Sequence, residues 1–592
     1  MKPLDLPVDL EDVLTAFRAR HGRTPRVLHI GNIANNAFYN ASLLRKAGLE
    51  CDVICYNYYH VMSCPEWEEA DFDGTPPGDA SAPRWYELSL GPYRRPRWFA
   101  QGPQPLCLDY LAARAAQSRT RAELLWRVLE IANRTASPMR LVAAVDQGWY
   151  FASKLQQIVS DPQAAAALRR RLFGKLQRIV SHPEPAVSLR RRLLPLERRI
   201  GRWAAALSLR AALMLLAVMR WLVVCCIRLA PDTLERTVQE SGNAIGELAA
   251  ATAAANQLVA RFRAEFPERV DSLTETDLRT YEWNYARWKA LLPHYDLIIG
   301  YSTDPAWVLM AGVPYFALEH GTLREIPFAP TPQGRCTALA YRLAEHVFVT
   351  NHDCLPNAHA LAGDRVTFIN HPYDEDRGLQ VTGWEALRKE LACALDADFL
   401  VFAPTRHDWV PGTGYADKAN DVLIRAFCML RRSGQRVGII FCDWGANVDQ
   451  SKALLRDAGC NSHVRWVAPM GLVHFQRTAR ACHVVADQFK LGAFGGIMFK
   501  ALAVGAPVLT YLDDAPLRAH YPEPPPVVNC HSENEIVATI SDLIAHPARL
   551  ETLSRASRGW IKTYHAGSQT VAMQLRVFAH WLELRAQGVQ GQ

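Results

Sequence analysis

The sequence lacks two features that would place the chain outside the cell or around a structural metal. Its first residues, MKPLDLPVDLEDVL, are acidic and contain no basic segment followed by an apolar core, so we expect no secretory signal. The 14 cysteines form no CxxC pair and no framework spacing. Reduced thiols in a cytoplasmic protein are therefore expected, rather than disulfides or a zinc site.

The composition also excludes a disordered chain. Hydrophobic residues make up 49% of the 592 positions and charged residues only 21%, which is typical of a folded protein. A chain of this length can form several domains with large cores.

Positive charge is concentrated in one segment. Between 165 and 230 there are 14 arginines and lysines against two acids, whereas the net charge of the whole chain is +7. The basic residues include two copies of LRRRL, in a tandem repeat at 158–178 and 179–199. Such clustering indicates a local anionic partner. Nucleic acid is not expected, because apolar residues rather than stacking aromatics accompany the arginines.

An apolar stretch at 203–231 continues this segment. On a helix, four arginines fall within a wedge of roughly 80°: Arg202, Arg210, Arg220 and Arg228. A helix in the plane of an anionic membrane keeps all four at the headgroups. A spanning helix would bury Arg220 at a cost of roughly 2.5–3.5 kcal/mol, and a core helix with solvated arginines is the third interpretation. We expect 158–231 to contact an anionic membrane surface.

Elsewhere the chain reads as two α/β series. The first starts with a strand at 26–31, a polar turn (NIANNAFYN), a helix and a strand at 51–56, which is a βαβ beginning. Further short apolar strands are expected at 296–301, 314–320, 346–351 and 365–370. The interval from about 120 to 290 reads as helical.

The second series follows a polar, turn-rich stretch at 371–380. Strands are expected at 399–405, 436–442, 463–469, 483–487, 507–513 and 525–530, before a helical tail from about residue 533. Short, nearly continuous apolar strands suit parallel sheets covered on both faces. We predict an α/β fold with two Rossmann-like, doubly wound parallel-sheet domains and a cleft between them.

Two cations and a glycine turn mark that cleft. Arg406 follows the first strand of the second series and Lys418 precedes the next helix, so both are expected at the carboxyl ends of strands, where together they suit a diphosphate. The stretch ADQFKLGAFGGIMFK (486–500) reads as a strand end, a glycine turn and a helix. Backbone amides at such a helix start bind anions.

This arrangement resembles the family 4 (group 1) glycosyltransferases of the GT-B fold, well over 385–570 and more loosely at 24–60 and 296–372. The resemblance implies that Arg406 and Lys418 clamp the diphosphate of a nucleotide-sugar donor. Phe494 and Gly495 match the family's glycine–phenylalanine–glycine turn. DWGANVDQSKAL (443–454) resembles its glycine turn near the base.

The resemblance fails at two carboxylates. The family has a glutamate, seven residues and a second glutamate here, near the sugar and the ribose; this chain has Gly492 and Lys500. A lysine cannot accept hydrogen bonds from ribose hydroxyls, but it can pair with phosphate or with Asp487. Asp487 and Gln488 are the polar replacements expected for sugar contacts.

In the first half, Glu319 and His320 come at a strand end. The family commonly has a histidine there, and an imidazole at this point can donate to a sugar hydroxyl or relay a proton. Gly31, Asn32 and Asn35 resemble the loop lining the acceptor side. We expect His320 and Asp487 to orient the sugar, with Glu319 on the acceptor side.

No metal or other cofactor is expected. Asp-x-Asp elements occur at 71–73, 374–376 and 396–398, but none follows a convincing strand. Cationic side chains and a helix dipole can neutralise a departing diphosphate instead.

The predicted function is transfer of a sugar from a nucleotide donor to a glycan or lipid-linked acceptor at the cytoplasmic membrane face, in polysaccharide or cell-envelope assembly. Retention at the anomeric carbon is implied by the resemblance. The alternatives are a catalytically degenerate GT-B protein that binds sugar nucleotide or a partner, and an epimerase or phosphorylase on the same fold.

The predicted organisation has five segments. They are the first part of an N-terminal Rossmann-like domain on the acceptor side (1–119), a basic amphipathic helical insertion (120–290), the second part of that domain (291–380), a nucleotide-sugar-binding domain (381–570) and a C-terminal helix (571–592).

Overall fold

The computed structural model describes residues 4, 7–72, 74–134, 232–410 and 417–586. The chain divides into two compact units, Met1–Pro138 with Ala254–Gln592, and Met139–Ala253. The predicted basic segment at 158–231, including its repeat and apolar stretch, lies outside the described residues. In the part that is described, no helix has the length and apolar character needed to cross a membrane.

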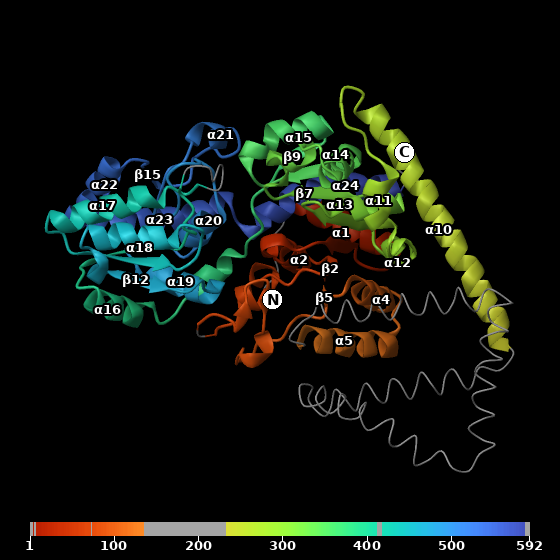
Figure 1. Ribbon diagram of the computed structural model, residues 1–592, viewed down its shortest axis with the longest axis horizontal. Helices are drawn as coiled ribbons and strands as arrows, with labels where there is room; N and C mark the ends of the chain where they lie inside the picture. Colours follow the sequence, from red (N-terminus) through yellow and green to blue (C-terminus); the bar gives the residue numbers. More distant parts are fainter. Residues whose placement is uncertain (1–3, 5–6, 73, 135–231, 411–416, 587–592) are drawn as a thin grey trace, which may run out of the picture. The chain divides into compact units, whose positions relative to one another are not determined.

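The first unit contains two parallel sheets (Figure 1). The first sheet has seven strands in the order β5-β2-β1-β6-β7-β8-β9. These are β1 (Arg26–Ile30), β2 (Glu50–Tyr56), β5 (Phe99–Gly102), β6 (Leu297–Tyr301), β7 (Phe316–Glu319), β8 (His346–Val349) and β9 (Val366–Phe368). All neighbours pair in parallel.

Helices separate these strands along the chain. They are α1 (Val8–His21), α2 (Asn36–Lys46), α3 (Pro65–Glu69), α4 (Gln104–Ala115), α5 (Arg119–Arg134), α10 (Asp232–Glu265), α11 (Glu275–Glu282), α12 (Tyr285–Leu291), α13 (Pro305–Ala311), α14 (Pro332–Leu343) and α15 (Leu355–Ala362). A short antiparallel pair, β3 (Gly78–Asp79) and β4 (Ala82–Pro83), follows α3. The expected polar turn after β1 is shorter than predicted, because α2 already begins at Asn36.

The second sheet has six parallel strands in the order β12-β11-β10-β13-β14-β15. They are β10 (Phe399–Ala403), β11 (Val437–Cys442), β12 (Val464–Val467), β13 (Val484–Ala486), β14 (Val508–Thr510) and β15 (Val528–Asn529). The helices are α16 (Trp384–Ala394), α17 (Asn420–Arg432), α18 (Val448–Asp457), α19 (Leu472–Ala481), α20 (Gly496–Ala503), α21 (Asp514–Arg518), α22 (Glu533–Ala545) and α23 (Ala548–Tyr564).

The strands are apolar because helices cover both faces of each sheet. Every residue of β6, β10 and β11 is buried, as expected for central strands of parallel sheets. The prediction of two Rossmann-like, doubly wound sheets is confirmed. The edge strand β5 was not predicted: its four residues, FAQG, include a polar and a glycine position and carry no recognisable period.

The last helix, α24 (Gly567–Ala586), returns to the first sheet. Val571, Leu575 and Phe578 are buried in one core with residues of β1, β2 and β6. Gln574 exchanges hydrogen bonds of 2.9 and 2.8 Å with Asn40 of α2. The C-terminal helix therefore belongs to the core of the first domain. The chain passes between the two domains twice, once before α16 and again before α24.

Candidate active site

Strand order identifies where a ligand is expected in each sheet. The order reverses between β10 and β13 in the second sheet and between β1 and β6 in the first. In doubly wound sheets, ligands bind outside the carboxyl ends of the strands at such a switch point. The loops that leave β10 and β13 contain most of the residues predicted from sequence.

Asp487 follows β13 directly and faces the start of α20. Its side chain is buried, and Oδ2 has no hydrogen-bond partner among the described residues. A Cβ atom added at Gly495 would lie 3.5 Å from that oxygen, so the carboxylate is close to the backbone of Gly495. Burial raises the pKa of Asp487 to about 6, although the nearby ammonium of Lys418 acts in the opposite direction.

Lys418 lies near this carboxylate, and Arg406 acts on Lys418 in turn. Burial lowers the pKa of Lys418; Asp487 opposes this effect, and the positive charges of Arg406 and Arg324 add to it. Arg406 pairs with Asp408, with 2.6 Å between Nε and Oδ2. Cations from both domains thus act on one another at this point. The linking residues 411–416 are outside the described part of the chain.

The loop after β10 is held by the loop after β11. His407 donates its backbone N–H to Trp444 at 2.8 Å, and Asn447 donates to the carbonyl of His407 at 2.7 Å. Gly445 has φ of +111°, and a Cβ there would lie 2.4 Å from the nitrogen of His407, so only glycine fits. The glycine turn recognised at 443–454 therefore fixes the backbone next to Arg406.

Helix α20 directs its N-terminus to the same region. Gly495 is its N-cap, and the exposed Gly496 and the half-buried Ile497 form its first turn. The first amides of a helix have no intrahelical acceptor and attract anions. An anion bound at this helix start would lie beside Asp487, whose carboxylate the ammonium of Lys418 attracts.

The remaining predicted residues of this loop have internal contacts. Gln488 is buried; its Nε2 donates to Tyr511, and its Oε1 accepts from the backbone of Lys490 and Leu491 at 3.1 and 2.6 Å. Phe494 is buried among aromatic rings, with Trp560 at 5.8 Å and His565 at 5.5 Å between ring centroids. Both side chains shape the loop, and their predicted donor contacts stay predictions.

Gly492 has a conformation that explains the missing first glutamate. Its φ is +71°, and a Cβ would lie 3.0 Å from the ring of Tyr511 and 3.3 Å from Asp513. A side chain at this position would be strained and crowded. The loop is therefore built around a glycine rather than around the carboxylate that the family has there.

Lys500 has a carboxylate partner from the first domain. Its Nζ lies 3.5 Å from Oε2 of Glu68, which belongs to α3. Glu68 is 3% exposed at the side chain and accepts hydrogen bonds from the hydroxyl of Tyr39 and from Asn35. Lys500 also lies over the ring of Tyr39, at 5.7 Å. The partner is thus Glu68 rather than Asp487.

On the first domain, His320 points a free nitrogen toward this region. Its Nδ1 is buried and has no partner among the described residues. Burial, with the charges of Arg324 and Lys500, lowers the pKa of His320 to about 4, so the ring is neutral at pH 7. The ring of His371 lies edge-on to it, with 5.9 Å between centroids.

Glu319 faces away from solvent and holds the loop. It is fully buried and accepts hydrogen bonds from the backbone of Gly321 and from Asn351. Burial raises its pKa. Its contacts place His320 at the end of β7, and its predicted acceptor contact stays a prediction.

The acceptor-side loop after β1 is similarly engaged. Asn32 donates to Asn35 and to the carbonyl of Ser63, at 2.9 and 2.8 Å, and accepts from the backbone of Phe38. Asn35 donates to Cys64 and, at 3.4 Å, to Glu68. These amides fix the loop, which leaves Ala34 and Asn36 to line the cleft.

Glycine is required at position 31 because the side chain of Asp304 lies close to its backbone. Its φ is +90°, and a Cβ would lie 1.9 Å from Oδ2 of Asp304. Burial raises the pKa of Asp304 to about 7, and the hydroxyl of Tyr56 donates to it. Asp304 follows β6 at the switch point of the first sheet, and sequence reasoning did not identify it.

A cavity of about 450 Å³ connects several of these groups. Residues of both domains line it, including His320, Glu68, Lys500, Gly496 and Trp444. Its volume is within the range of small-molecule sites. Glu68 was missed because α3 has no motif; the acids clustered in CPEWEEADFD were the available signal.

Within the described residues, no group of three or more histidine, cysteine, aspartate or glutamate side chains is arranged to hold a metal ion. Asp71 and Asp374 of the Asp-x-Asp elements pair with Arg477 and Lys46, at 2.9 and 2.7 Å.

Comparison by sequence found neither a matching family model nor a matching curated protein. Among solved structures, the chain is similar to HepE of Anabaena in complex with UDP and glucose (17% identity, TM-score 0.42, covering 51% of this chain and 83% of that one). It is also similar to sucrose-phosphate synthase of Thermosynechococcus elongatus (16%, 0.40, 53% and 80%). WaaG, a glycosyltransferase involved in lipopolysaccharide biosynthesis, matches similarly (15%, 0.36, 53% and 85%).

Glycosyltransferases are thus among the matched structures, as the sequence resemblance predicted.

Asp487 gives a pH-dependent prediction. Its pKa in the folded protein is about 6 against an ordinary value of 3.8, so its ionisation destabilises the fold as pH rises from about 4 to 6, and the full cost persists above 6. We expect Asp487→Asn to raise the free energy of unfolding at pH 7.5 by up to about 3 kcal/mol, because the raised pKa already includes the attraction to Lys418.

Urea unfolding from pH 4 to 8 measures this effect. The gain should disappear near pH 4, and Asp398→Asn, at a side chain 76% exposed, should show no such trend. A constant loss of stability at every pH would contradict the assignment of Asp487 as a destabilising buried carboxylate.

Proposed function

We propose that the chain is a glycosyltransferase that uses a nucleotide-sugar donor. The observation that carries the proposal is the grouping of Asp487 and Lys418 at the start of α20, where the second sheet reverses its strand order, with the positive charge of Arg406 acting on Lys418. Arg324 of the first domain, whose guanidinium pairs with Asp353 at 2.6 Å, also acts electrostatically on Lys418. A nucleoside diphosphate matches this site in charge and in position.

The proposed mechanism is electrostatic. As the bond to the sugar breaks, negative charge develops on the diphosphate, and fixed cations and helix amides stabilise it without a metal ion. The neutral ring of His320 and the carboxylate of Asp487 are available to hydrogen-bond sugar hydroxyls from opposite domains. The cavity bounded by Glu68 and Trp444 then receives the acceptor.

The acceptor is proposed to be a glycan or a lipid-linked glycan at the cytoplasmic membrane face, in polysaccharide or cell-envelope assembly. The support is the sequence of 158–231, whose arginines are suited to anionic lipid. Co-sedimentation of the chain with anionic vesicles, with and without 158–231, tests this part separately.

A second candidate is a non-catalytic protein that binds sugar nucleotide. It is favoured by the absence of carboxylates at Gly492 and Lys500, together with the crowded backbone at Gly492. Turnover of the donor distinguishes the two candidates, because a binding protein releases the nucleotide sugar unchanged.

A thermal-shift panel of nucleosides, nucleoside mono- and diphosphates and nucleotide sugars tests the proposed site. A ligand that binds only the native state stabilises it by about 2.7 kcal/mol at 100 times its Kd. We expect diphosphates and nucleotide sugars to raise Tm by a few degrees and the nucleoside to have little effect. No shift with any diphosphate would contradict the proposal.

A further inference from the structure

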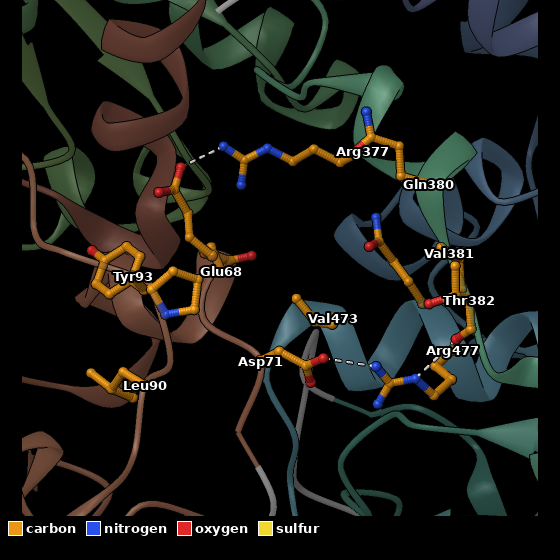
Figure 2. Close-up of a pocket in the computed structure, with 13 residues that line it drawn as sticks. Glu68, Asp71, Leu90, Tyr93, Arg377, Gln380, Val381, Thr382, Val473 and Arg477 are labelled. Carbon is orange, nitrogen blue, oxygen red and sulfur yellow. Dashed lines mark hydrogen bonds and ion pairs between the residues drawn. The ribbon is translucent and has the colours of Figure 1, made fainter.

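A second cavity, of about 560 Å³, lies on the other side of Glu68. Figure 2 shows its walls: Tyr93 and Leu90 on one side, Gln380, Val381 and Thr382 on the other, with Arg377 above and Val473 and Arg477 below. We call it the second chamber. Both domains and the connecting segment that includes Gln380 contribute to it.

The fixed charges of the second chamber are already paired. Arg377 bonds Glu69 at 2.5 Å and Asp374 at 3.4 Å. Arg477 bonds Asp71 at 2.9 Å, as the dashed line in Figure 2 marks. A charged ligand would therefore have to break an existing ion pair, and the chamber favours a neutral one.

Glu68 is also paired: its carboxylate forms an ion pair with Lys500, which lines the other cavity. Every charged side chain in the described lining of the second chamber therefore has a partner of opposite sign. The lining combines these paired charges with uncharged polar and apolar side chains.

The uncharged part of the lining suits carbohydrate. Gln380 and Thr382 are exposed side chains that can bond hydroxyl groups. Opposite them, Leu90, Pro92 and the ring of Tyr93 form an apolar flank. Sugars present both hydroxyls and C–H faces, so an apolar and aromatic wall facing amide and hydroxyl groups is complementary to them.

The position of the second chamber assigns it to the acceptor. Glu68 lines both this chamber and the cavity that contains His320 and Lys500. A ligand that fills the second chamber therefore ends at the boundary of the proposed reaction cleft, away from the diphosphate site at Gly495. The second chamber is larger than the first cavity. It has room for more than one sugar unit.

We propose that the second chamber binds neutral sugar units of an extended acceptor glycan. This inference rests on the proposed transferase function. It predicts that the chain recognises an oligosaccharide rather than a single sugar, and that recognition is separable from binding of the nucleotide.

The test uses the full chain with saturating UDP and a panel of neutral linear tetrasaccharides, with an oligogalacturonate as the charged comparison. Saturation-transfer NMR should show contact with at least one neutral tetrasaccharide and none with the oligogalacturonate. Gln380→Trp, which fills the second chamber, should raise the Kd of that tetrasaccharide at least tenfold, and Thr382→Trp should do the same.

Leu379→Trp is the matched control, because Leu379 is 66% exposed beside Gln380 and does not line the second chamber. It should leave the Kd unchanged. The inference is overturned if no neutral tetrasaccharide binds, or if binding is insensitive to Gln380→Trp. A thermal shift with UDP in the same samples keeps this failure distinct from failure of the proposed function, which would remove the shift.

Discussion

Replacing Arg406 with alanine should lower kcat for donor turnover by about 10²–10³-fold. Two backbone hydrogen bonds fix its loop to the neighbouring strand end, and its positive charge acts on Lys418. A fixed cation that meets charge developing in the transition state contributes on this scale. The change should affect kcat more than KM, because the charge on the diphosphate grows as the sugar departs.

Lys418→Met should cause a loss of kcat of similar size. Burial lowers the pKa of Lys418, so an apolar chain of similar length removes a desolvation cost. It also leaves the buried carboxylate of Asp487 without the attraction of the ammonium, so we expect the free energy of unfolding to fall above about pH 6, where Asp487 is ionised. The matched control is Arg436→Ala, because Arg436 precedes β11 and lies at the opposite end of the sheet. Steady-state kinetics and urea unfolding on the three variants separate catalysis from folding. Unchanged kcat in Arg406→Ala would contradict the diphosphate assignment.

Lys500→Glu should inactivate the protein even though it restores the residue type that the family has there. The new carboxylate, on a side chain one bond shorter, would face Glu68 where Nζ now lies 3.5 Å away, and both would be largely buried. Breaking a buried pair costs about 3–5 kcal/mol because one charge is left without compensation. We therefore expect a lower Tm and a loss of turnover of at least about 100-fold, which corresponds to about 2.7 kcal/mol.

The reciprocal exchange is the decisive comparison. Glu68→Lys alone should also be destabilised, while the double variant Glu68→Lys with Lys500→Glu should recover a substantial part of the stability, as a double-mutant cycle measures. Lys500→Gln serves as the neutral control. If Lys500→Glu instead increased activity, the pairing of Lys500 with Glu68 would have no functional meaning.

Most of the fold follows from local patterns. Strands such as β6, β10 and β11 are buried over their whole length, so their sequences are short continuous apolar runs that parallel sheets explain. The edge strand β5 has four residues and a mixed composition, and an edge needs less apolar surface. The return of α24 to the first sheet depends on contacts such as Gln574 with Asn40, which no local pattern encodes.

The site divides in the same way. Asp487 and Gly495 lie at the ends of elements that sequence places well, so their proximity could be predicted from strand ends alone. Glu68 could not, because its role depends on α3 reaching across to a lysine 432 positions later. The type of side chain alone does not show whether a residue binds a ligand. Gln488 was predicted to contact the sugar, yet its amide oxygen accepts hydrogen bonds from the backbone of its own loop.

The measurement that tests the central claim most directly is the Kd of UDP relative to that of UMP, by titration calorimetry on the full chain. If Arg406, Lys418 and the start of α20 hold the second phosphate, UDP should bind at least tenfold more tightly than UMP, a difference of about 1.4 kcal/mol, and Arg406→Ala should remove most of that preference. Equal affinities for the two nucleotides would contradict the account.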